Sequence, residues 1–363
     1  MSESPVRVLI VEDSPTVRHR LRSALTADPG IAVVAEAEDG VTAVELCRRL
    51  RPHVVTMDVV LPGISGLEAT AQIMAQAPTP ILVVSAAERD EVFTTYDALA
   101  AGAVEVMEKP RGDATDDQWG ERLCATVKLL ARVPVVTRHQ RDVRTEPVVA
   151  TPADPTPTGR AGTIDVVALG ASTGGPGAVV DLLQALPATF TVPILLVQHI
   201  PHDPFVYAYA DWLSGRAGRP VSYARGGDPV GSLAGQVLMA PPDRHMIIGN
   251  GTVWLTRDPP RHSCRPSVDS LFESVAAGYG RHAAACLLSG MGRDGASGLL
   301  TIRQANGRTF AQDEASCVVF GMPKAAAELG AVEFSLPPAE IGRRLCALAG
   351  VANPTGGRWR TQS

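Results

Sequence analysis

Short apolar runs rich in β-branched residues alternate with amphipathic stretches along the first third of the chain. The runs read VRVLIV, IAVVAEA, HVVTM, PILVVSA and AVEVM, and GVTAVELCRRL is typical of the stretches between them. Such runs fit buried parallel strands, and the amphipathic stretches fit helices that cover a sheet. The pattern predicts a doubly wound parallel sheet of five strands with five helices at residues 1–132.

The alternation stops at residues 133–162, where prolines and threonines accumulate without a helical or strand period, and this composition predicts a linker. It resumes in IDVVALG, VPILLVQHI, QVLMAP, AAACLLS and RTFAQD, and Asn250-Gly251 between two apolar runs predicts a hairpin. We therefore expect a second α/β domain at 163–352, doubly wound and Rossmann-like with an antiparallel hairpin. A disordered tail is expected at 353–363.

The composition supports this division and narrows the classes of function. The 363 residues, 45% of them hydrophobic, are enough for two packed domains. The start MSESPVRVLIVED lacks the features of a signal peptide, no apolar run is long enough to cross a bilayer, and the six dispersed cysteines form no CxxC pair. We expect a cytoplasmic protein with reduced thiols and no direct membrane insertion. A net charge of -5 gives no general attraction to polyanions, so nucleic acid is not an expected partner.

Polar residues follow the predicted strands of the first domain. Glu12 and Asp13 follow LIV, Asp58 follows VVTM, Ser85 follows ILVV and Lys109 follows VEVM. Parallel strands bring their carboxyl ends to one edge of the sheet, so these residues are expected to converge. Three carboxylates there favour Mg²⁺, and lysine and serine complete a site for a phosphoryl group that Asp58 can accept. The alternative for an acidic residue is a helix N-cap, as for Asp13 before SPTVRHRL.

Four motifs of this domain resemble the receiver domain of two-component response regulators, over residues 5–131: VEDSP, MDVVLPGISGLE, VVSA and EKP. The resemblance implies phosphoryl transfer from a histidine kinase to Asp58, and switching through Ser85 and Lys109. It also implies that Mg²⁺ is bound by Glu12, Asp13, Asp58 and the backbone carbonyl of Val60. One departure is Val106, which stands where many receivers have an aromatic residue, so the usual aromatic rotation cannot serve as the switch.

The second domain has a serine in a glycine-rich turn between a strand and a helix, GASTGGP, in which the serine is Ser172. Three interpretations compete: a phosphate-binding loop, a nucleophile turn, and a connection without chemistry. A dinucleotide fingerprint would need glycine at position 172, and a P-loop would need a Lys-Ser/Thr pair at the helix start. The turn fits G-x-S-x-G, although the candidate histidine follows only one strand later instead of coming last.

Two further residues complete a candidate triad. His199 ends the buried run PILLVQ and is suited to take a serine proton, although His202, His245 and His262 are nearby competitors and a lone histidine is usually structural. Asp294 follows the glycine-rich SGMGR segment and either orients the histidine or caps the helix that begins near Ala296. Together the three residues supply a nucleophile, a base and an orienting carboxylate, and the glycine-rich turns could direct N–H groups at an oxyanion.

Residues from about Ile164 to Leu348 resemble the catalytic domain of the chemotaxis protein-glutamate methylesterases through GASTGGP, VQHI, APPDRH, RPSVDSLF, SGMGRDGASG and AQDEASCVVFGMPKAA. The resemblance implies hydrolysis of γ-glutamyl methyl esters on methyl-accepting chemotaxis receptors, often with deamidation of receptor glutamines. It implies these roles: Ser172 attacks, His199 is the general acid/base, Asp294 orients it, the N–H of Met291 holds the oxyanion, and Thr173 is a further candidate beside the nucleophile. The segment 200–205 departs from the turn that relatives usually have there.

The first domain has an acidic site and the second has a candidate triad. This combination suggests that the first domain controls the activity of the second domain. We hypothesise that the unphosphorylated receiver covers Ser172 and that the charge added at Asp58 loosens this docking. Two alternatives stay open. The chain could be a response regulator whose second domain only binds a partner, or a hydrolase of the same mechanism with a substrate outside chemotaxis.

Overall fold

The computed structural model describes residues 4–86, 89–110, 116–133, 135, 164–200 and 206–352. The predicted linker at 133–162 and the predicted tail at 353–363 lie outside these residues, apart from Val133 and Val135. In the described ranges, none of the helices has both the length and the apolar character that spanning a bilayer requires.

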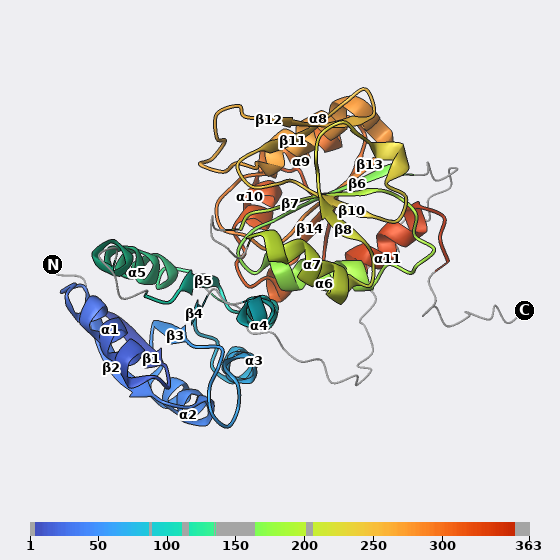
Figure 1. Ribbon diagram of the computed structural model, residues 1–363. Coiled ribbons are helices and arrows are strands. Elements are labelled where there is room, and N and C mark those ends of the chain that lie inside the picture. Colours follow the sequence, from blue (N-terminus) through green and yellow to red (C-terminus); the bar gives the residue numbers. More distant parts are fainter. Residues whose placement is uncertain are drawn as a thin grey trace, which may run out of the picture.

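The first half folds around a five-stranded parallel sheet with the strand order β2-β1-β3-β4-β5 (Figure 1). Its strands are β1 (Val6–Val11), β2 (Ile31–Ala37), β3 (Val54–Met57), β4 (Ile81–Ser85) and β5 (Glu105–Glu108). Its helices are α1 (Pro15–Thr26), α2 (Gly40–Leu50), α3 (Gly66–Gln76), α4 (Arg89–Ala100) and α5 (Asp116–Leu130). The predicted alternation of five strands and five helices is confirmed.

Local capping explains where three of these helices begin. The Ser14 hydroxyl accepts from the N–H of Val17 (3.5 Å) at the start of α1, and the Asp39 carboxylate accepts from the N–H of Thr42 (2.8 Å) at the start of α2. Ser65 and Glu68 form a reciprocal capping box on α3. Because Ser14 caps α1, the alternative that Asp13 serves as its cap is wrong.

The second half contains a seven-stranded sheet, all parallel, with the order β15-β14-β13-β6-β7-β10-β8. Its strands are β6 (Val166–Ala171), β7 (Ile194–Gln198), β8 (Val221–Tyr223), β10 (Val237–Met239), β13 (Ala283–Leu287), β14 (Arg308–Gln312) and β15 (Phe334–Leu336). The helices are α6 (Gly175–Gln184), α7 (Val206–Ala217), α8 (Val268–Tyr279), α9 (Ala296–Gln304), α10 (Met322–Glu328) and α11 (Pro338–Leu348), with short 3₁₀ turns η1 (Val230–Ser232), η2 (Gly280–His282) and η3 (Glu314–Ser316).

The strand order reverses beside β6. The chain passes from β6 to β7 on one side of the sheet and returns later to place β13 on the other side. In an open parallel sheet, such a switch point leaves a crevice outside the carboxyl ends of the strands, where ligands usually bind. The loops that follow β6, β7 and β13 therefore meet at the position where a site is expected.

A three-stranded antiparallel sheet lies beside the larger one and contains β9 (Asp228–Pro229), β11 (His245–Gly249) and β12 (Thr252–Thr256). Asn250 and Gly251 connect β11 to β12 with positive φ values of 52° and 70°. A two-residue hairpin turn of type I′ requires this backbone conformation at both positions, which favours the Asn-Gly pair. The predicted hairpin is confirmed.

Helix α4 of the first half lies against α6 and α7 of the second half (Figure 1). The buried Tyr96 on α4 packs its ring 5.0 Å from that of Tyr209 and 5.4 Å from that of Trp212 on α7. A Cβ at Gly177 would lie 2.6 Å from the carbonyl oxygen of Ala100, so glycine permits the close approach of α6 to the end of α4. One buried apolar cluster runs from the first sheet into the second across this contact.

Candidate active site

The acidic residues of the first domain converge at one edge of the sheet, as expected from the strand ends. Ligand oxygens of Glu12, Asp13 and Asp58 lie within 4.8 Å of one another. Lys109 on the segment after β5 places its ammonium 2.8 Å from Asp58 Oδ2 and 3.2 Å from Glu12 Oε2. Glu12 and Asp58 are buried, and burial together with the charge of Asp58 raises the pKa of Glu12 to about 7. Three crowded carboxylates with one lysine retain negative charge, which suits a hard divalent cation.

Two other residues of the predicted phosphorylation site, Val60 and Ser85, lie at the same edge of the sheet. Val60 is two residues after Asp58, and its N–H donates to Asp58 Oδ1 at 3.3 Å. Ser85 ends β4, is fully buried, and donates to the carbonyl oxygen of Ala86 at 3.3 Å. The donor set of Glu12, Asp13 and Asp58 thus fits Mg²⁺, with Ser85 on the neighbouring strand.

Ser172 begins the turn between β6 and α6. Its N–H donates to the carbonyl oxygen of Ser289 (3.0 Å), and its own carbonyl oxygen accepts from Gly175 N (2.7 Å) and Gln198 Nε2 (2.9 Å). Gly174 is the N-cap of α6 with φ 73°, and a Cβ there would lie 2.4 Å from Val318. Glycine is therefore required both for the left-handed conformation and for the close packing that fix the serine backbone.

His199 and Asp294 are paired. His199 follows β7, its N–H donates to the carbonyl oxygen of Ala171 (2.9 Å), and its Nε2 lies 3.0 Å from Asp294 Oδ2. Its Nδ1 lies 3.8 Å from the sulfur of Cys264, a contact that the sequence did not predict. The sequence places these residues far apart, and the switch point of the sheet brings them together.

The Asp294 carboxylate is held by four donors. Besides His199, it accepts from Ser267 Oγ (2.8 Å), Val268 N (2.7 Å) and Asp269 N (3.1 Å), which form the first turn of α8. Burial alone would raise the pKa of Asp294, but the hydrogen bond and charge of His199 and the donors of α8 lower it. The N-cap of α9 is Gly295, without a side-chain cap, so the alternative that Asp294 caps this helix is wrong.

The pKa of His199 is raised to about 9. Burial by itself would lower this pKa, because it disfavours the charged imidazolium. The hydrogen bonds with Asp294 and Cys264 and the negative charge of Asp294 outweigh burial. Near neutral pH the imidazole is therefore protonated on both ring nitrogens. It becomes a free base only as the pH approaches 9.

Ser172 and His199 line the same cavity, of about 180 Å³. Within the described part of the chain, the Ser172 side chain makes no hydrogen bond, and His199 contacts Asp294 and Cys264 instead. Catalytic hydrogen bonds are often loose without substrate, so this geometry is compatible with a nucleophile and base that engage on binding.

The turn after β13 passes directly beside Ser172. A Cβ at Gly290 would lie 2.8 Å from the Cβ of Ser172 and 2.2 Å from the sulfur of Met322, so only glycine fits there. Met291 follows this glycine directly in the chain. Thr173 lines the cavity, and its carbonyl oxygen accepts from Ser289 Oγ at 2.8 Å.

Two of the histidines that compete with His199 for the role of base, His245 and His262, have structural partners. His245 is buried, with Nδ1 accepting from Ser267 N (3.1 Å) and Nε2 lying 3.3 Å from the carbonyl oxygen of Pro259. His262 pairs with Asp269 at 3.2 Å. His202 lies outside the described residues, as does most of the 200–205 segment.

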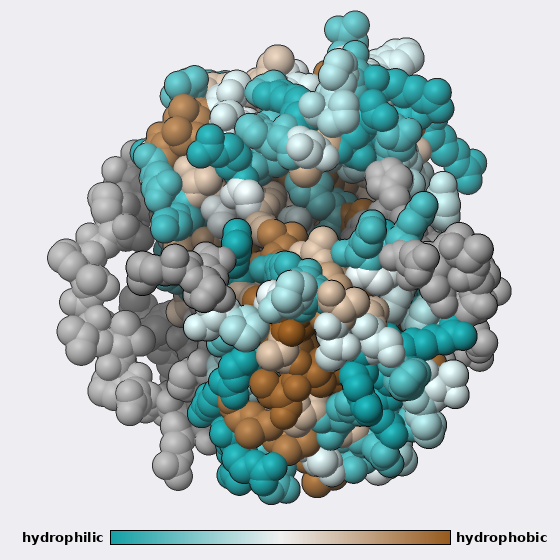
Figure 2. All heavy atoms as spheres, turned by 90° about the vertical axis from the view of Figure 1, so that its left-hand side faces the viewer, coloured by the Kyte–Doolittle hydropathy of each residue, from teal (hydrophilic) through white to brown (hydrophobic). Residues whose placement is uncertain are grey.

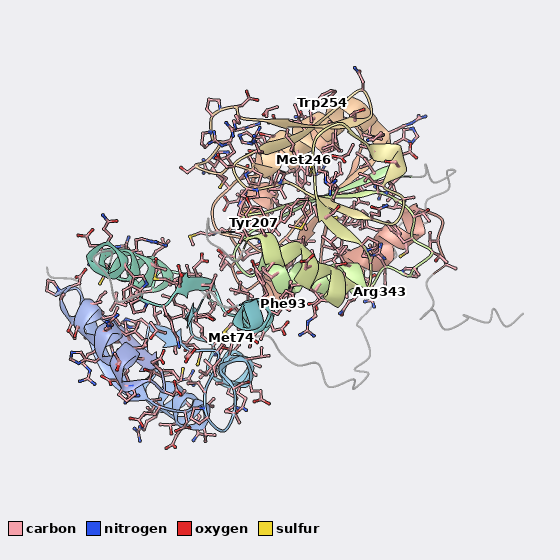
Figure 3. All side chains as sticks on the ribbon, viewed as in Figure 1. Met74, Phe93, Tyr207, Met246, Trp254 and Arg343 are labelled. Atoms are coloured by element: carbon pink, nitrogen blue, oxygen red, sulfur yellow. The ribbon has the colours of Figure 1, made fainter. Side chains whose placement is uncertain are left out.

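Residues of the first domain close the cavity over Ser172. The lining includes five of them, from α4, from the residue before β5 and from the start of β5: Tyr96, Leu99, Val104, Glu105 and Val106. Burial raises the pKa of Glu105 to about 7. Figure 3 labels Phe93 on α4 and Tyr207 on α7, two exposed aromatic residues on the helices that meet at this boundary. The position of Val106 is thus part of the cover over the serine.

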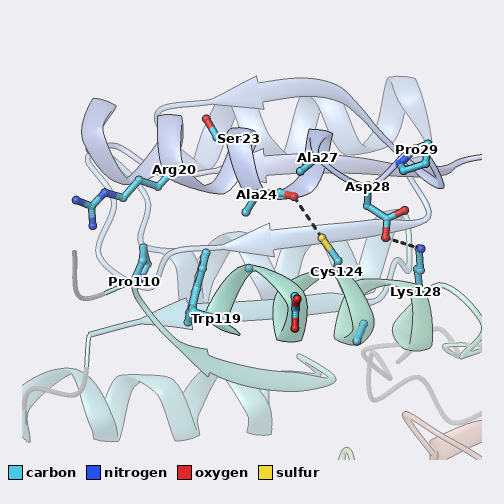
Figure 4. A pocket seen from close by; sticks show the side chains of 13 residues that line it. Arg20, Ser23, Ala24, Ala27, Asp28, Pro29, Pro110, Trp119, Cys124 and Lys128 are labelled. Atoms are coloured by element: carbon cyan, nitrogen blue, oxygen red, sulfur yellow. Dashed lines mark hydrogen bonds and ion pairs between the residues drawn. The ribbon is translucent and has the colours of Figure 1, made fainter. Parts of the chain in front are cut away.

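A larger cavity, of about 840 Å³, lies between α1 and α5 (Figure 4). Figure 2 views the molecule from the side of these helices and shows an apolar patch on the lower half of the surface. Trp119 and Cys124 line the cavity, and Lys128 and Asp28 form an ion pair at its edge (2.5 Å). It shares no lining residue with the cavity over Ser172.

Comparisons with known proteins identify relatives of both domains. Residues 167–345 match the CheB methylesterase family, and residues 8–115 match the response regulator receiver domain. A protein-glutamate methylesterase/protein-glutamine glutaminase of Anaeromyxobacter dehalogenans is 45% identical over 94% of this chain and 97% of its own, and one of Myxococcus xanthus is 46% identical over 89% and 91%. The crystal structure of the Thermotoga maritima CheB methylesterase catalytic domain is 34% identical, covering 51% of this chain and 99% of that chain, with a TM-score of 0.48.

The chain thus combines a response regulator receiver domain with a hydrolase domain of the methylesterase type. The chain belongs to the CheB methylesterase family. It is therefore an enzyme, and the alternative of a second domain that only binds a partner is wrong.

Proposed function

We propose that the chain hydrolyses γ-glutamyl methyl esters on the cytoplasmic helices of methyl-accepting chemotaxis receptors, and that it deamidates receptor glutamines. The receiver occupies residues 1–132, the linker 133–162, the catalytic domain 163–352 and the tail 353–363. The observation that carries the proposal is the 3.0 Å contact between His199 and Asp294, because His199 lines the same cavity as Ser172. The names of the curated relatives give the ester and amide substrates.

The chemistry follows from the contacts of the three residues. Because Asp294 holds Nε2 of His199, Nδ1 is the ring nitrogen left to take the Ser172 proton. The serine oxygen attacks the ester carbon, and the N–H of Met291 stabilises the oxyanion, with Thr173 beside it. The imidazolium returns its proton to the departing methanol, and water then hydrolyses the acyl-enzyme with the same base. With a glutamine substrate, the leaving group is ammonia.

The receiver is the proposed input of the enzyme. A chemotaxis histidine kinase transfers a phosphoryl group to Asp58, and Ser85 and Lys109 respond to the added charge. Mg²⁺ held by Glu12, Asp13, Asp58 and the carbonyl oxygen of Val60 would neutralise charge on the transferring group. Because α4 and the entry to β5 cover Ser172, movement of these elements would uncover it.

The test is release of methanol from methylated receptor by the full chain, with and without a phosphoryl donor. The proposal expects release that the donor accelerates. Release from other methyl esters, with none from receptor, would favour the alternative of a hydrolase that acts outside chemotaxis.

Asp58→Asn is expected to remove the acceleration by the phosphoryl donor and to leave the unstimulated rate close to that of the parent. An amide of the same shape cannot form the acyl phosphate, and Asp58 does not line the cavity over Ser172. Methanol release measured against donor concentration checks this result. A variant that the donor still accelerates would show that phosphorylation acts at another residue.

The rate at limiting substrate is expected to rise with pH up to about 9, by about tenfold per pH unit below that value. The pKa of His199 is raised to about 9, so protonation at lower pH removes the base. A pH profile of kcat/KM on a small ester checks this. Asp294→Asn should move the rise to lower pH while reducing the maximum rate, and a parent profile that is flat between about pH 7 and 9 would contradict the assignment of the base.

A further inference from the structure

Cys264 is fixed beside the imidazole of His199 by a short loop that follows β12. Arg261 N donates to the carbonyl oxygen of Cys264 (3.1 Å), and Cys264 N donates to that of Arg261 (2.7 Å). The two residues between them, His262 and Ser263, both have positive φ values, 49° and 64°. The Arg261 guanidinium is anchored by two hydrogen bonds to Glu273, at 2.6 and 2.7 Å. A backbone conformation that side chains rarely adopt is thus maintained, and it holds the thiol at the active site.

The separation of the two atoms matches that of neighbouring metal ligands. Tetrahedral zinc has bonds of about 2.0–2.1 Å to imidazole nitrogen and about 2.3 Å to thiolate sulfur, which places two such ligands about 3.6 Å apart. The distance from His199 Nδ1 to Cys264 Sγ is 3.8 Å. Little movement would be needed for one cation to bind both atoms.

Asp294 supplies the support that metal-binding histidines usually have. A ligating histidine generally donates its other ring N–H to a carboxylate, which fixes the tautomer and directs the free lone pair at the metal. Nε2 of His199 contacts Asp294 at 3.0 Å, so in the neutral imidazole Nδ1 carries the lone pair that faces Cys264. The Asp294 carboxylate itself accepts four hydrogen bonds and is better suited to orient the histidine than to bind the cation.

The other clusters of the described residues offer less. His262, Asp269 and Asp294 also lie within reach of one centre, but Arg261 is 3.8 Å from Asp269 and would repel a cation. The remaining five cysteines are buried, whereas Cys264 is partly exposed. The His199–Cys264 pair is therefore the site that a soft cation could enter.

We propose that His199 Nδ1 and Cys264 Sγ form an inhibitory binding site for a thiophilic divalent cation such as Zn²⁺. The thiol and the protonated Nδ1 of His199 each lose a proton to solvent as the metal bonds form, and water completes the coordination. The cation occupies the lone pair that would take the Ser172 proton, so hydrolysis stops while the metal is bound. The blocking of hydrolysis rests on the proposed function, whereas the binding of the metal does not.

The full chain is titrated with Co²⁺ and with Zn²⁺, and two quantities are recorded. One is the near-ultraviolet absorbance of the thiolate-to-cobalt charge transfer, and the other is the rate of ester hydrolysis relative to each variant's metal-free rate. The parent should develop the absorbance, and Zn²⁺ should lower its rate at least about tenfold, reversibly on chelation. Cys264→Ser should lose the absorbance and weaken zinc inhibition at least about tenfold, and Asp294→Asn should weaken cobalt affinity about 10- to 100-fold.

Cys346→Ser is the matched control, because Cys346 is a buried thiol on α11 that bonds to no histidine among the described residues, and this variant should behave as the parent does. No charge-transfer absorbance in the parent, or equal absorbance and inhibition in Cys264→Ser, would overturn the proposal. Absorbance that depends on Cys264 in a chain without esterase activity would keep the metal site and reject the proposed function. Ester hydrolysis that zinc does not inhibit would keep the proposed function and reject the inhibitory metal site.

Discussion

Ser172→Ala is expected to lower methanol release from methylated receptor by at least about a thousandfold, with or without a phosphoryl donor. Alanine keeps the Cβ that packs beside Gly290 but removes the oxygen that attacks the ester. What remains is the contribution of the oxyanion donors and of binding. Methanol release by parent and variant under the same conditions checks the result.

Ser297→Ala provides the matched control. Ser297 is an exposed serine on α9, outside the lining of the cavity over Ser172, so its loss should leave the rate unchanged. If Ser172→Ala retained more than about a tenth of the parent rate, the serine would not be the nucleophile.

Asp97→Ala is expected to raise the rate of the unphosphorylated chain by about ten- to a hundredfold. Asp97 on α4 accepts from Trp212 Nε1 (2.7 Å) and Arg216 Nε (2.9 Å) on α7, and so ties the receiver to the catalytic domain. Hydrogen bonds to charged groups contribute about 1.5–3 kcal/mol, and each 1.4 kcal/mol is a factor of ten in the docked population. The measurement is methanol release without a phosphoryl donor.

Asp28→Ala is the control for this experiment. Asp28 is also an ion-paired aspartate of the receiver, bound to Lys128 at 2.5 Å, but it lies on the segment after α1 and contacts no residue of the catalytic domain in the described structure. It should leave the unstimulated rate unchanged. An Asp97→Ala variant that folds as the parent does and is no faster would show that docking through α4 does not restrain the enzyme.

The alternation of apolar and amphipathic segments was sufficient to predict both sheets, because long buried strands have a strong local signal. Two edge strands of the second sheet, β8 and β15, were not predicted. Each has three residues, VSY and FSL, and the exposed serine in the middle leaves no apolar run to recognise, unlike the equally short VLM of β10. Their positions are set by neighbouring strands and not by their own sequence.

The convergence of Ser172, His199 and Asp294 could be expected because each follows a strand whose carboxyl end reaches the same edge of the sheet. The contacts of Asp294 with the first turn of α8 could not, since they depend on how this helix packs against the loop after β13. Cys264 was also missed, because its loop reaches His199 only through the tertiary fold. Nothing local in α4 indicates that this helix closes the cavity.

The most direct test of the account is the rate at which a serine-directed acylating probe labels the full chain, with and without a phosphoryl donor, with the labelled residue located by peptide mapping. The account predicts a label on Ser172 that forms faster after phosphorylation and is suppressed in His199→Ala. A label on another residue, or on Ser172 at a rate that phosphorylation does not change, would contradict the claim that the receiver covers a reactive serine.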